Sequence, residues 1–152
     1  MSMHGPRRSA AWHAILRVAY AWLRLMDPLL RLGWQTGGLG ITSRLCARGR
    51  RSGRSRCVLI GLLRVEGRWY VGHPNGQVAW TRNLAEDIGA TIQPWHAAPV
   101  RVRAIPLRPG AERTAVILAT ARQQPFPANL LYRAARCHIM AVGVYFRLEA
   151  TG

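Results

Sequence analysis

The chain has 152 residues, enough for one domain with a real core and too few for two. Hydrophobic residues make up 49% of it, which excludes a disordered chain. All 22 basic residues are arginine, and the formal net charge is +16, so the surface favours anionic partners such as phosphate, carboxylate, nucleic acid or an acidic membrane.

Residues 9–32 are predicted to form an amphipathic helix within an N-terminal segment assigned to residues 1–34. Arginines interrupt its apolar run, so neither a spanning helix nor a signal peptide is expected, and Pro28 should end or kink the helix near Asp27. Its polar side chains form one stripe: His13, Arg17, Tyr20, Arg24, Asp27 and Arg31. The wide apolar face has two interpretations that can both hold. In the first, the apolar face packs on the chain's own domain. In the second, it lies in the interface of an anionic membrane.

A glycine-rich linker over residues 35–40 leads to the domain proper, assigned to residues 41–152. The predicted strands are 41–47, 56–65, 68–72, 90–93, 98–107 and 139–148, and the predicted helices are 78–88, 112–121 and 129–136. Glu66-Gly67 predicts a tight hairpin turn, and Arg101 and Arg103 alternate with valines, as in a strand with one wet face. We therefore expect a mainly β, α+β fold: an antiparallel barrel with peripheral helices.

The remaining polar residues argue against several kinds of site. The cysteines, Cys46, Cys57 and Cys137, have no metal-like spacing and indicate reduced thiols in a cytoplasmic protein. The six acidic residues form no acid–base pair, and the five histidines have no carboxylate or cysteine at ligand spacing. Neither a metal site nor a hydrolytic triad is expected, so any enzymatic chemistry would come from a bound cofactor.

Two loops have residues suited to an anionic ligand. Residues 49–56, Gly-Arg-Arg-Ser-Gly-Arg-Ser-Arg, can cradle a phosphate with backbone amides and clamp it with guanidinium groups, although an arginine-rich turn is also typical of a solvated loop. Residues 73–76, His-Pro-Asn-Gly, lead into a helix with Trp80 and Asn83 on one face. Taken alone, Trp80 is more typical of a core residue than of a cofactor-binding one.

These pieces follow a specific order along the chain. A strand is followed by Gly-Arg-Arg-Ser-Gly-x-x-Arg, a β-hairpin, a glycine loop and Trp-x-x-Asn-Leu at residues 80–84. From about residue 41 to 84, this order resembles the deazaflavin-dependent nitroreductase family. The resemblance implies a split antiparallel β-barrel that binds coenzyme F-420, an 8-hydroxy-5-deazaflavin with a phosphate-bearing acidic tail. Since other split-barrel proteins bind flavin mononucleotide, FMN is the alternative cofactor.

The resemblance also implies roles for individual residues. The cofactor-binding residues would be Arg50, Arg51, Ser52, Gly53, Arg56, Asn75, Gly76, Trp80 and Asn83. Arg51 and Arg56 would meet the phosphate and the acidic tail, and all of these residues would line one cleft. His73 and Tyr132 are substrate-side candidates, and no catalytic residue is assigned. The implied reaction is hydride transfer from the reduced coenzyme to a small organic acceptor: a quinone, a nitro compound or an activated alkene.

The chain departs from the family pattern in three places. The loop at residues 73–76 is short, the Pro-Leu pair common after the loop arginine is absent after Arg56, and the tyrosine-rich substrate wall is reduced to Tyr132 with Phe126. Cofactor class is therefore better supported than substrate.

Two alternatives come from other functional classes. The arginine cluster at residues 44–56 would suit a nucleic-acid-binding module, but no aromatic residues interleave with it as a stacking platform requires. The second alternative is a non-catalytic, ligand-binding protein at the inner face of the cell membrane. Its only support is the predicted N-terminal helix. The sequence leaves open whether the chain is a monomer or a homodimer.

Overall fold

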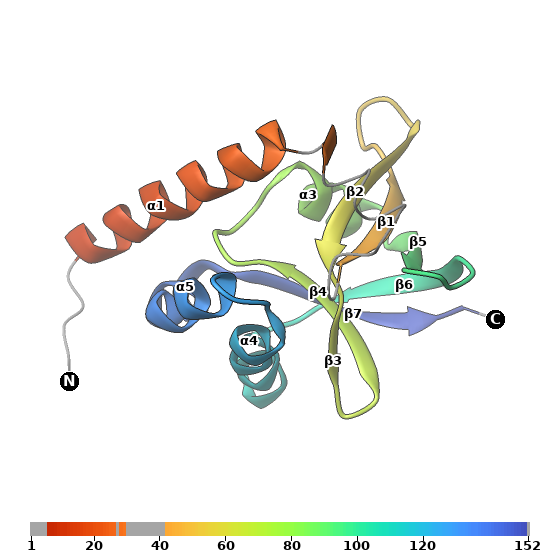
Figure 1. Ribbon diagram of the computed structural model, residues 1–152. Helices are drawn as coiled ribbons and strands as arrows, with labels where there is room; N and C mark the ends of the chain where they lie inside the picture. Colours follow the sequence, from red (N-terminus) through yellow and green to blue (C-terminus); the bar gives the residue numbers. More distant parts are fainter. Residues whose placement is uncertain (1–5, 27, 30–41, 152) are drawn as a thin grey trace.

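The computed structural model describes residues 6–26, 28–29 and 42–151, and its sheet is a single curled antiparallel layer of seven strands (Figure 1). The strands are β1 (Thr42–Arg48), β2 (Ser55–Gly61), β3 (Leu63–Val65), β4 (Arg68–His73), β5 (Gly89–Pro94), β6 (Val100–Pro106) and β7 (Val144–Ala150). The helices are α1 (Pro6–Leu25), α3 (Ala79–Glu86), α4 (Ala111–Gln123), α5 (Ala128–Ala134) and α6 (Arg136–Val142). The sheet order is β2-β1-β5-β6-β7-β4-β3. The predicted α+β split barrel with peripheral helices is confirmed.

The predicted strand at residues 56–65 is wrong in one respect, because it is two strands at opposite edges of the sheet. β2 pairs with β1, whereas β3 pairs with β4. Leu62, which separates them, is only 4% exposed and belongs to the barrel core. The chain therefore crosses from one sheet edge to the other at Leu62, which curls the sheet towards closure. The predicted turn follows β3, with positive φ at Glu66 and Gly67 (50° and 74°), as a two-residue hairpin of type I′ requires.

β4 and β7 bury both of their faces, so the domain has two cores. Val71 and its cross-strand partner Phe146 point into the barrel, where Leu45, Ile92 and Val102 also lie. The neighbouring side chains, Tyr70 and Tyr145, point the opposite way into a second core covered by α4, α5 and α6. Each fully buried apolar side chain contributes about 1.5–3 kcal/mol to the free energy of unfolding. In β6, Arg101 and Arg103 are exposed while Val102 is buried, as their alternation predicted.

The predicted strand at residues 139–148 is wrong over its first part. Ile139 belongs to α6, and the strand begins at Val144, after Gly143. Ile139 and His138 are buried against the second core, and this tertiary burial outweighs the strand preference of the apolar run. A Cβ atom at position 143 would lie 2.6 Å from the carbonyl oxygen of Ile139, so glycine is required where the helix gives way to the strand.

The expectation of reduced cysteines is wrong for two of the three. Cys46 and Cys57 are joined by a disulfide bond, and Cys137 is free and exposed. The β1–β2 register makes Cys46 and Cys57 direct cross-strand partners, with their Cα atoms 4.1 Å apart. Spacing along the sequence did not reveal this pairing, because it depends on where the hairpin turns.

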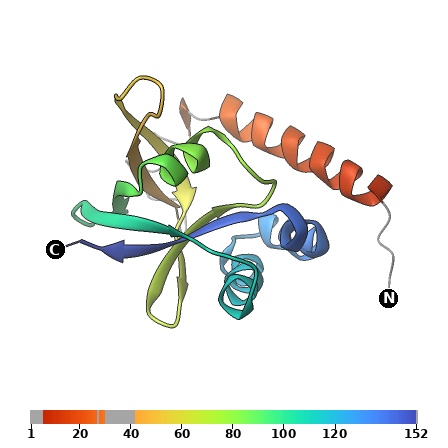
Figure 2. The same cartoon turned by 180° about the vertical axis from the view of Figure 1, so that it is seen from behind.

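α1 lies along the outside of the molecule, next to α5 and α6 (Figures 1 and 2). It ends at Leu25, before Pro28, as expected. The predicted linker at residues 35–40 falls outside the described residues. In the part of the chain that the structure describes, none of the helices has both the length and the apolar character needed to cross a bilayer.

Candidate functional site

The loop between β1 and β2 is a tight turn, and we call residues 48–56 the arginine hairpin. The backbone N–H of Gly49 donates to the carbonyl oxygen of Arg54 (2.8 Å), and the N–H of Gly53 donates to that of Gly49 (2.8 Å). Ser52 Oγ accepts a hydrogen bond from the N–H of Arg54 (3.3 Å). Gly53 has a φ of 65°, which glycine adopts without strain. The turn therefore presents its arginines from a defined backbone.

The arginines of this hairpin are exposed, and their charge is not neutralised. They are Arg48, Arg50, Arg51, Arg54 and Arg56. None of the ion pairs between described residues involves them, because those ion pairs gather at Glu112 and Glu149. The backbone N–H groups of Arg51 and Ser52 also lack a hydrogen-bond partner among the described residues. Guanidinium groups with adjacent free amides are a donor set that phosphate oxygens prefer.

α3 packs beside the arginine hairpin, against β1 and β6. Asn83 Oδ1 accepts a hydrogen bond from the backbone N–H of Arg50 (3.3 Å). Trp80, three residues earlier, is partly exposed and packs against the barrel core, whereas Thr81 and Leu84 are fully buried. The hydrogen bond confirms that this helix and the hairpin meet although they are far apart in the sequence. That Trp80 and Asn83 bind a cofactor stays a prediction.

Asn75 and Gly76, which we predicted beside the same cofactor, are held from a different side. Asn75 Nδ2 donates to the carbonyl oxygen of His13 in α1 (3.2 Å), and Asn75 Oδ1 accepts from His138 Nε2 in α6 (2.9 Å). Gly76 has a φ of 93° and lies against the carbonyl oxygen of Val142. The contacts of Asn75 with described residues do not reach the arginine hairpin, so its side chain anchors helices here.

The two substrate-side candidates, His73 and Tyr132, lie in a cluster under α1 in which His73 is buried and Tyr132 is half-buried. The hydroxyl groups of Tyr20 and Tyr132 are hydrogen-bonded (2.8 Å), and the ring of Tyr20 lies 4.4 Å from that of His73 between centroids. His73 Nδ1 accepts a hydrogen bond from the backbone N–H of Asn75 (3.2 Å), so the ring proton is on Nε2. Tyr145 belongs to the second core against which Tyr132 packs, and we call these residues the tyrosine cluster.

Burial sets the protonation states of the tyrosine cluster. It raises the pKa of Tyr20 to about 12 and raises the pKa of Tyr132 well above its usual value. It lowers the pKa of His73 to about 4. At neutral pH the cluster therefore holds a neutral imidazole and protonated tyrosines, which can donate hydrogen bonds to a ligand but carry no charge.

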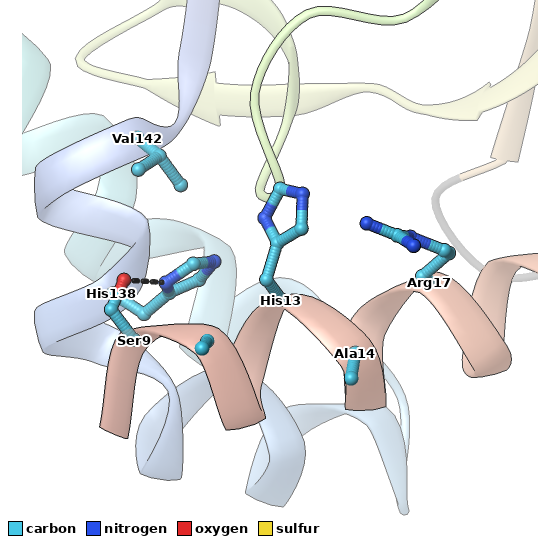
Figure 3. Close-up of a pocket in the computed structure, with 7 residues that line it drawn as sticks. Ser9, His13, Ala14, Arg17, His138 and Val142 are labelled. Atoms are coloured by element: carbon cyan, nitrogen blue, oxygen red, sulfur yellow. Dashed lines mark hydrogen bonds between the residues drawn. The ribbon is translucent and has the colours of Figure 1, made fainter. Parts of the chain in front are cut away.

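Two surface hollows lie away from the arginine hairpin. One, of about 660 Å³, lies between α1 and α6, where His13 stands between His138 and Arg17 and Ser9 is hydrogen-bonded to His138 (Figure 3). The other, of about 240 Å³, is lined by Thr42, Ser43, Leu62, Arg64, Pro94, Trp95 and Gln123. No residue predicted to bind the cofactor lines either hollow. The residues predicted to bind the cofactor form two groups instead. One comprises the arginine hairpin with Trp80 and Asn83 of α3, and the other comprises Asn75 and Gly76 under α1.

Two residues that contact the segment under α1, Tyr20 and His138, were not predicted as site residues. Tyr20 belonged to the predicted polar stripe of the N-terminal helix, but its partner Tyr132 could not be identified. His138 holds Ser9 and Asn75 together, and only its polarity within an apolar run marked it. Phe126, expected near Tyr132, is 77% exposed.

The comparisons with known proteins show the fold. No family model matches the sequence, and no curated protein sequence matches it. Among solved structures, an F-420-H2-dependent reductase is similar, with a TM-score of 0.55 at 17% identity over 72% of this chain and 94% of that one. A protein described as a domain-swapped dimer also has a TM-score of 0.55 at 17% identity, over 86% and 99%. An FAD-binding protein from Mesorhizobium loti has a TM-score of 0.50 at 12% identity, over 81% and 88%.

Proposed function

We propose that this protein is an oxidoreductase of the deazaflavin-dependent nitroreductase family, which binds coenzyme F-420 through the arginine hairpin. The observation that carries the proposal is the hydrogen bond from the Arg50 backbone to Asn83, which joins an unpaired cluster of arginines to the helix that bears Trp80. The fold shared with an F-420-H2-dependent reductase supports the same cofactor class. FMN is the alternative cofactor, because it also combines a flat ring system with a phosphate.

The donor set of the hairpin fits the acidic end of the coenzyme. The guanidinium groups of Arg51 and Arg56 would bind the phosphate and the carboxylates of the tail, and the free amides of Arg51 and Ser52 would bind phosphate oxygens. Trp80 and Asn83 would border the ring from α3. When bound, the reduced coenzyme supplies a hydride. The chain's own residues bind and orient it, and a formal charge of +16 favours a ligand with several negative charges.

The acceptor side of the proposal rests on the tyrosine cluster. A small organic acceptor, such as a quinone, a nitro compound or an activated alkene, presents oxygen atoms or a polarised double bond. Tyr132 and the Nε2 proton of His73 can donate hydrogen bonds to such an oxygen, since both groups are neutral at pH 7. We assign them as substrate-side residues without a proton-transfer step.

A series of three ligands tests the cofactor proposal. Riboflavin has the ring without a phosphate, FMN adds one phosphate, and coenzyme F-420 carries a phosphate and an acidic tail. Fluorescence titration should give the tightest binding for F-420, then FMN, then riboflavin, and the preference should shrink as salt screens the tail. Oxidation of the reduced coenzyme, followed by absorbance with a quinone or nitro acceptor, then tests turnover.

The same titration separates the proposal from nucleic-acid binding. Equal affinity for all three ligands, together with salt-sensitive binding of a single-stranded oligonucleotide, would assign the hairpin to nucleic acid. Nucleic acid is the weaker alternative because none of the five exposed hairpin arginines alternates with an aromatic residue in the sequence.

A further inference from the structure

α1 contacts the rest of the chain through polar and apolar residues of one side. Ser9 Oγ is hydrogen-bonded to His138 Nδ1 (3.1 Å), the carbonyl oxygen of His13 accepts from Asn75, and the Tyr20 hydroxyl pairs with that of Tyr132 (2.8 Å). Leu16 adds a fully buried apolar side chain at 1% exposure, and Trp12 packs against the second core. The side that faces the domain therefore combines Tyr20 of the predicted polar stripe with Ser9 and the apolar Leu16 and Trp12.

The opposite side of α1 is an exposed apolar row. It consists of Ile15, Val18, Trp22, Leu25 and, just beyond the helix, Leu29, which are 47%, 61%, 63%, 74% and 62% exposed. Their spacing of three and four residues places them on one helical face. Isolated exposed apolar residues are ordinary on a protein surface, whereas a continuous row marks an interaction surface. This row, unlike Leu16 and Trp12, thus does not serve the chain's own core.

Charge indicates what covers this row. The α1 sequence contains four arginines and no acidic residue, and Arg17 and Arg24 are exposed. A second copy of the chain would bring the same arginines and the same net charge of +16 to the contact. An anionic lipid surface instead offers acyl chains to the apolar row and headgroups of opposite sign to the arginines. Trp22, in the middle of the row, is the residue type that prefers the boundary between them.

We propose that α1 is an interfacial helix that docks the protein on the surface of an anionic lipid bilayer through the apolar row. Both ribbon views place α1 at the outer edge of the molecule (Figures 1 and 2). Lying flat, the helix would present about 15 Å of apolar row, from Ile15 to Leu25, to the lipid while the polar contacts with α6 and Tyr132 stay intact. The arginine contribution falls with salt, and the apolar contribution remains.

Sedimentation of the full chain with vesicles tests this proposal. Binding should occur to phosphatidylcholine vesicles that contain about 30% phosphatidylglycerol, should be weak with phosphatidylcholine alone, and should fall between about 0.05 and 0.5 M salt. Val18→Gln and Trp22→Gln should each lower the partition coefficient about tenfold. Leu130→Gln, which changes an exposed leucine of α5, should leave binding unchanged and serves as the matched control.

A second measurement locates the contact. Lipids with brominated acyl chains should quench tryptophan fluorescence, and Trp22→Phe should remove most of that quenching while the variant still sediments. The proposal is overturned if anionic vesicles do not bind the chain, or if Trp22→Gln binds as well as Leu130→Gln. It is also overturned if light scattering shows a dimer that Trp22→Gln converts to a monomer, since a second copy would then cover the row. These readouts need no cofactor.

Discussion

Asn83 Oδ1 accepts a hydrogen bond from the backbone N–H of Arg50 at 3.3 Å, across 33 residues of sequence. This contact ties the arginine hairpin to α3 and sets where the unpaired arginines lie relative to Trp80. It leaves the guanidinium groups free, because Asn83 engages only the backbone. An anionic ligand can therefore bind the hairpin without breaking the contact that orders it.

Two substitutions of Asn83 separate its ordering role from its effect on charge. Asn83→Ala should cost about 1 kcal/mol, speed hydrogen exchange of the Arg50 amide and weaken F-420 binding. Asn83→Asp can still accept the hydrogen bond, so it should keep the amide protected, yet it should weaken binding through its added negative charge. Exchange measured by NMR and affinity measured by fluorescence check both. Unchanged amide exchange in Asn83→Ala would show that the contact does not order the hairpin.

His73 should make stability depend on pH. Its folded-state pKa of about 4 lies below the ordinary value of 6.5 because burial disfavours the imidazolium, so the unfolded chain binds more protons between these values. The free energy of unfolding should be at its full value above pH 6.5 and should fall by about 3 kcal/mol as the pH is lowered to 4.

Chemical denaturation across this pH range checks the effect of His73. Glu112, whose pKa is lowered mainly by a hydrogen bond from Arg147, also loses stability on acidification, so the wild type must be compared with a variant. His73→Gln should flatten the dependence between pH 6.5 and 4, whereas His96→Gln, at an exposed position, should not. Parallel curves for His73→Gln and the wild type would contradict the assignment.

Sequence reasoning recovered the elements whose signal is local and missed those set by distant partners. The Glu66-Gly67 turn and the alternation of Arg101 and Arg103 are local, and both were predicted. The break at Leu62 was missed because its neighbours are equally apolar, and only their pairing with β1 or β4 separates them. Likewise, periodicity showed which residues share a face of α1, but not which face meets the domain.

The residues of the candidate site show the same contrast between local signals, which the sequence reveals, and distant partners, which it does not. The order of motifs along the chain predicted that the arginine hairpin would meet Asn83. Asn75 was grouped with them because it precedes the same helix. Its side chain is instead engaged by His13 and His138, which lie 62 and 63 residues away in the sequence. Such contacts follow from the docking of α1 and α6, and no local pattern encodes them.

The disulfide bond should stabilise the β1–β2 hairpin. Cys46 and Cys57 are 11 residues apart, and closing a loop of this size is worth about 2–3 kcal/mol. Cys57→Ser or a reductant should lower the free energy of unfolding by that amount, as measured by denaturation, while Cys137→Ser should not. Thiol titration of the native protein should detect Cys137 alone. Three reactive thiols in the native state would refute the bond.

Gly72 should tolerate no side chain. A Cβ atom there would overlap the ring of Tyr145, its cross-strand partner on β7. Gly72→Ala should therefore cost about 1–3 kcal/mol, and Tyr145→Leu in the same chain should recover part of that loss. Gly89→Ala is the matched control, because its Cβ atom would have only an ordinary contact, at 3.5 Å with Asp87. Thermal melts of the variants that coincide with the wild type would contradict this packing.

The most direct test of the central claim is the affinity of the arginine variants for coenzyme F-420. Arg51→Ala and Arg56→Ala should each raise the dissociation constant about ten- to a hundredfold, the range for hydrogen bonds to charged groups. Arg122→Ala is the matched control, because Arg122 is also exposed, on α4, and is absent from the described ion pairs. Fluorescence titration should give Arg122→Ala the wild-type affinity. Equal losses at all three positions would mean that the net charge of the protein, not a defined site on the arginine hairpin, attracts the coenzyme.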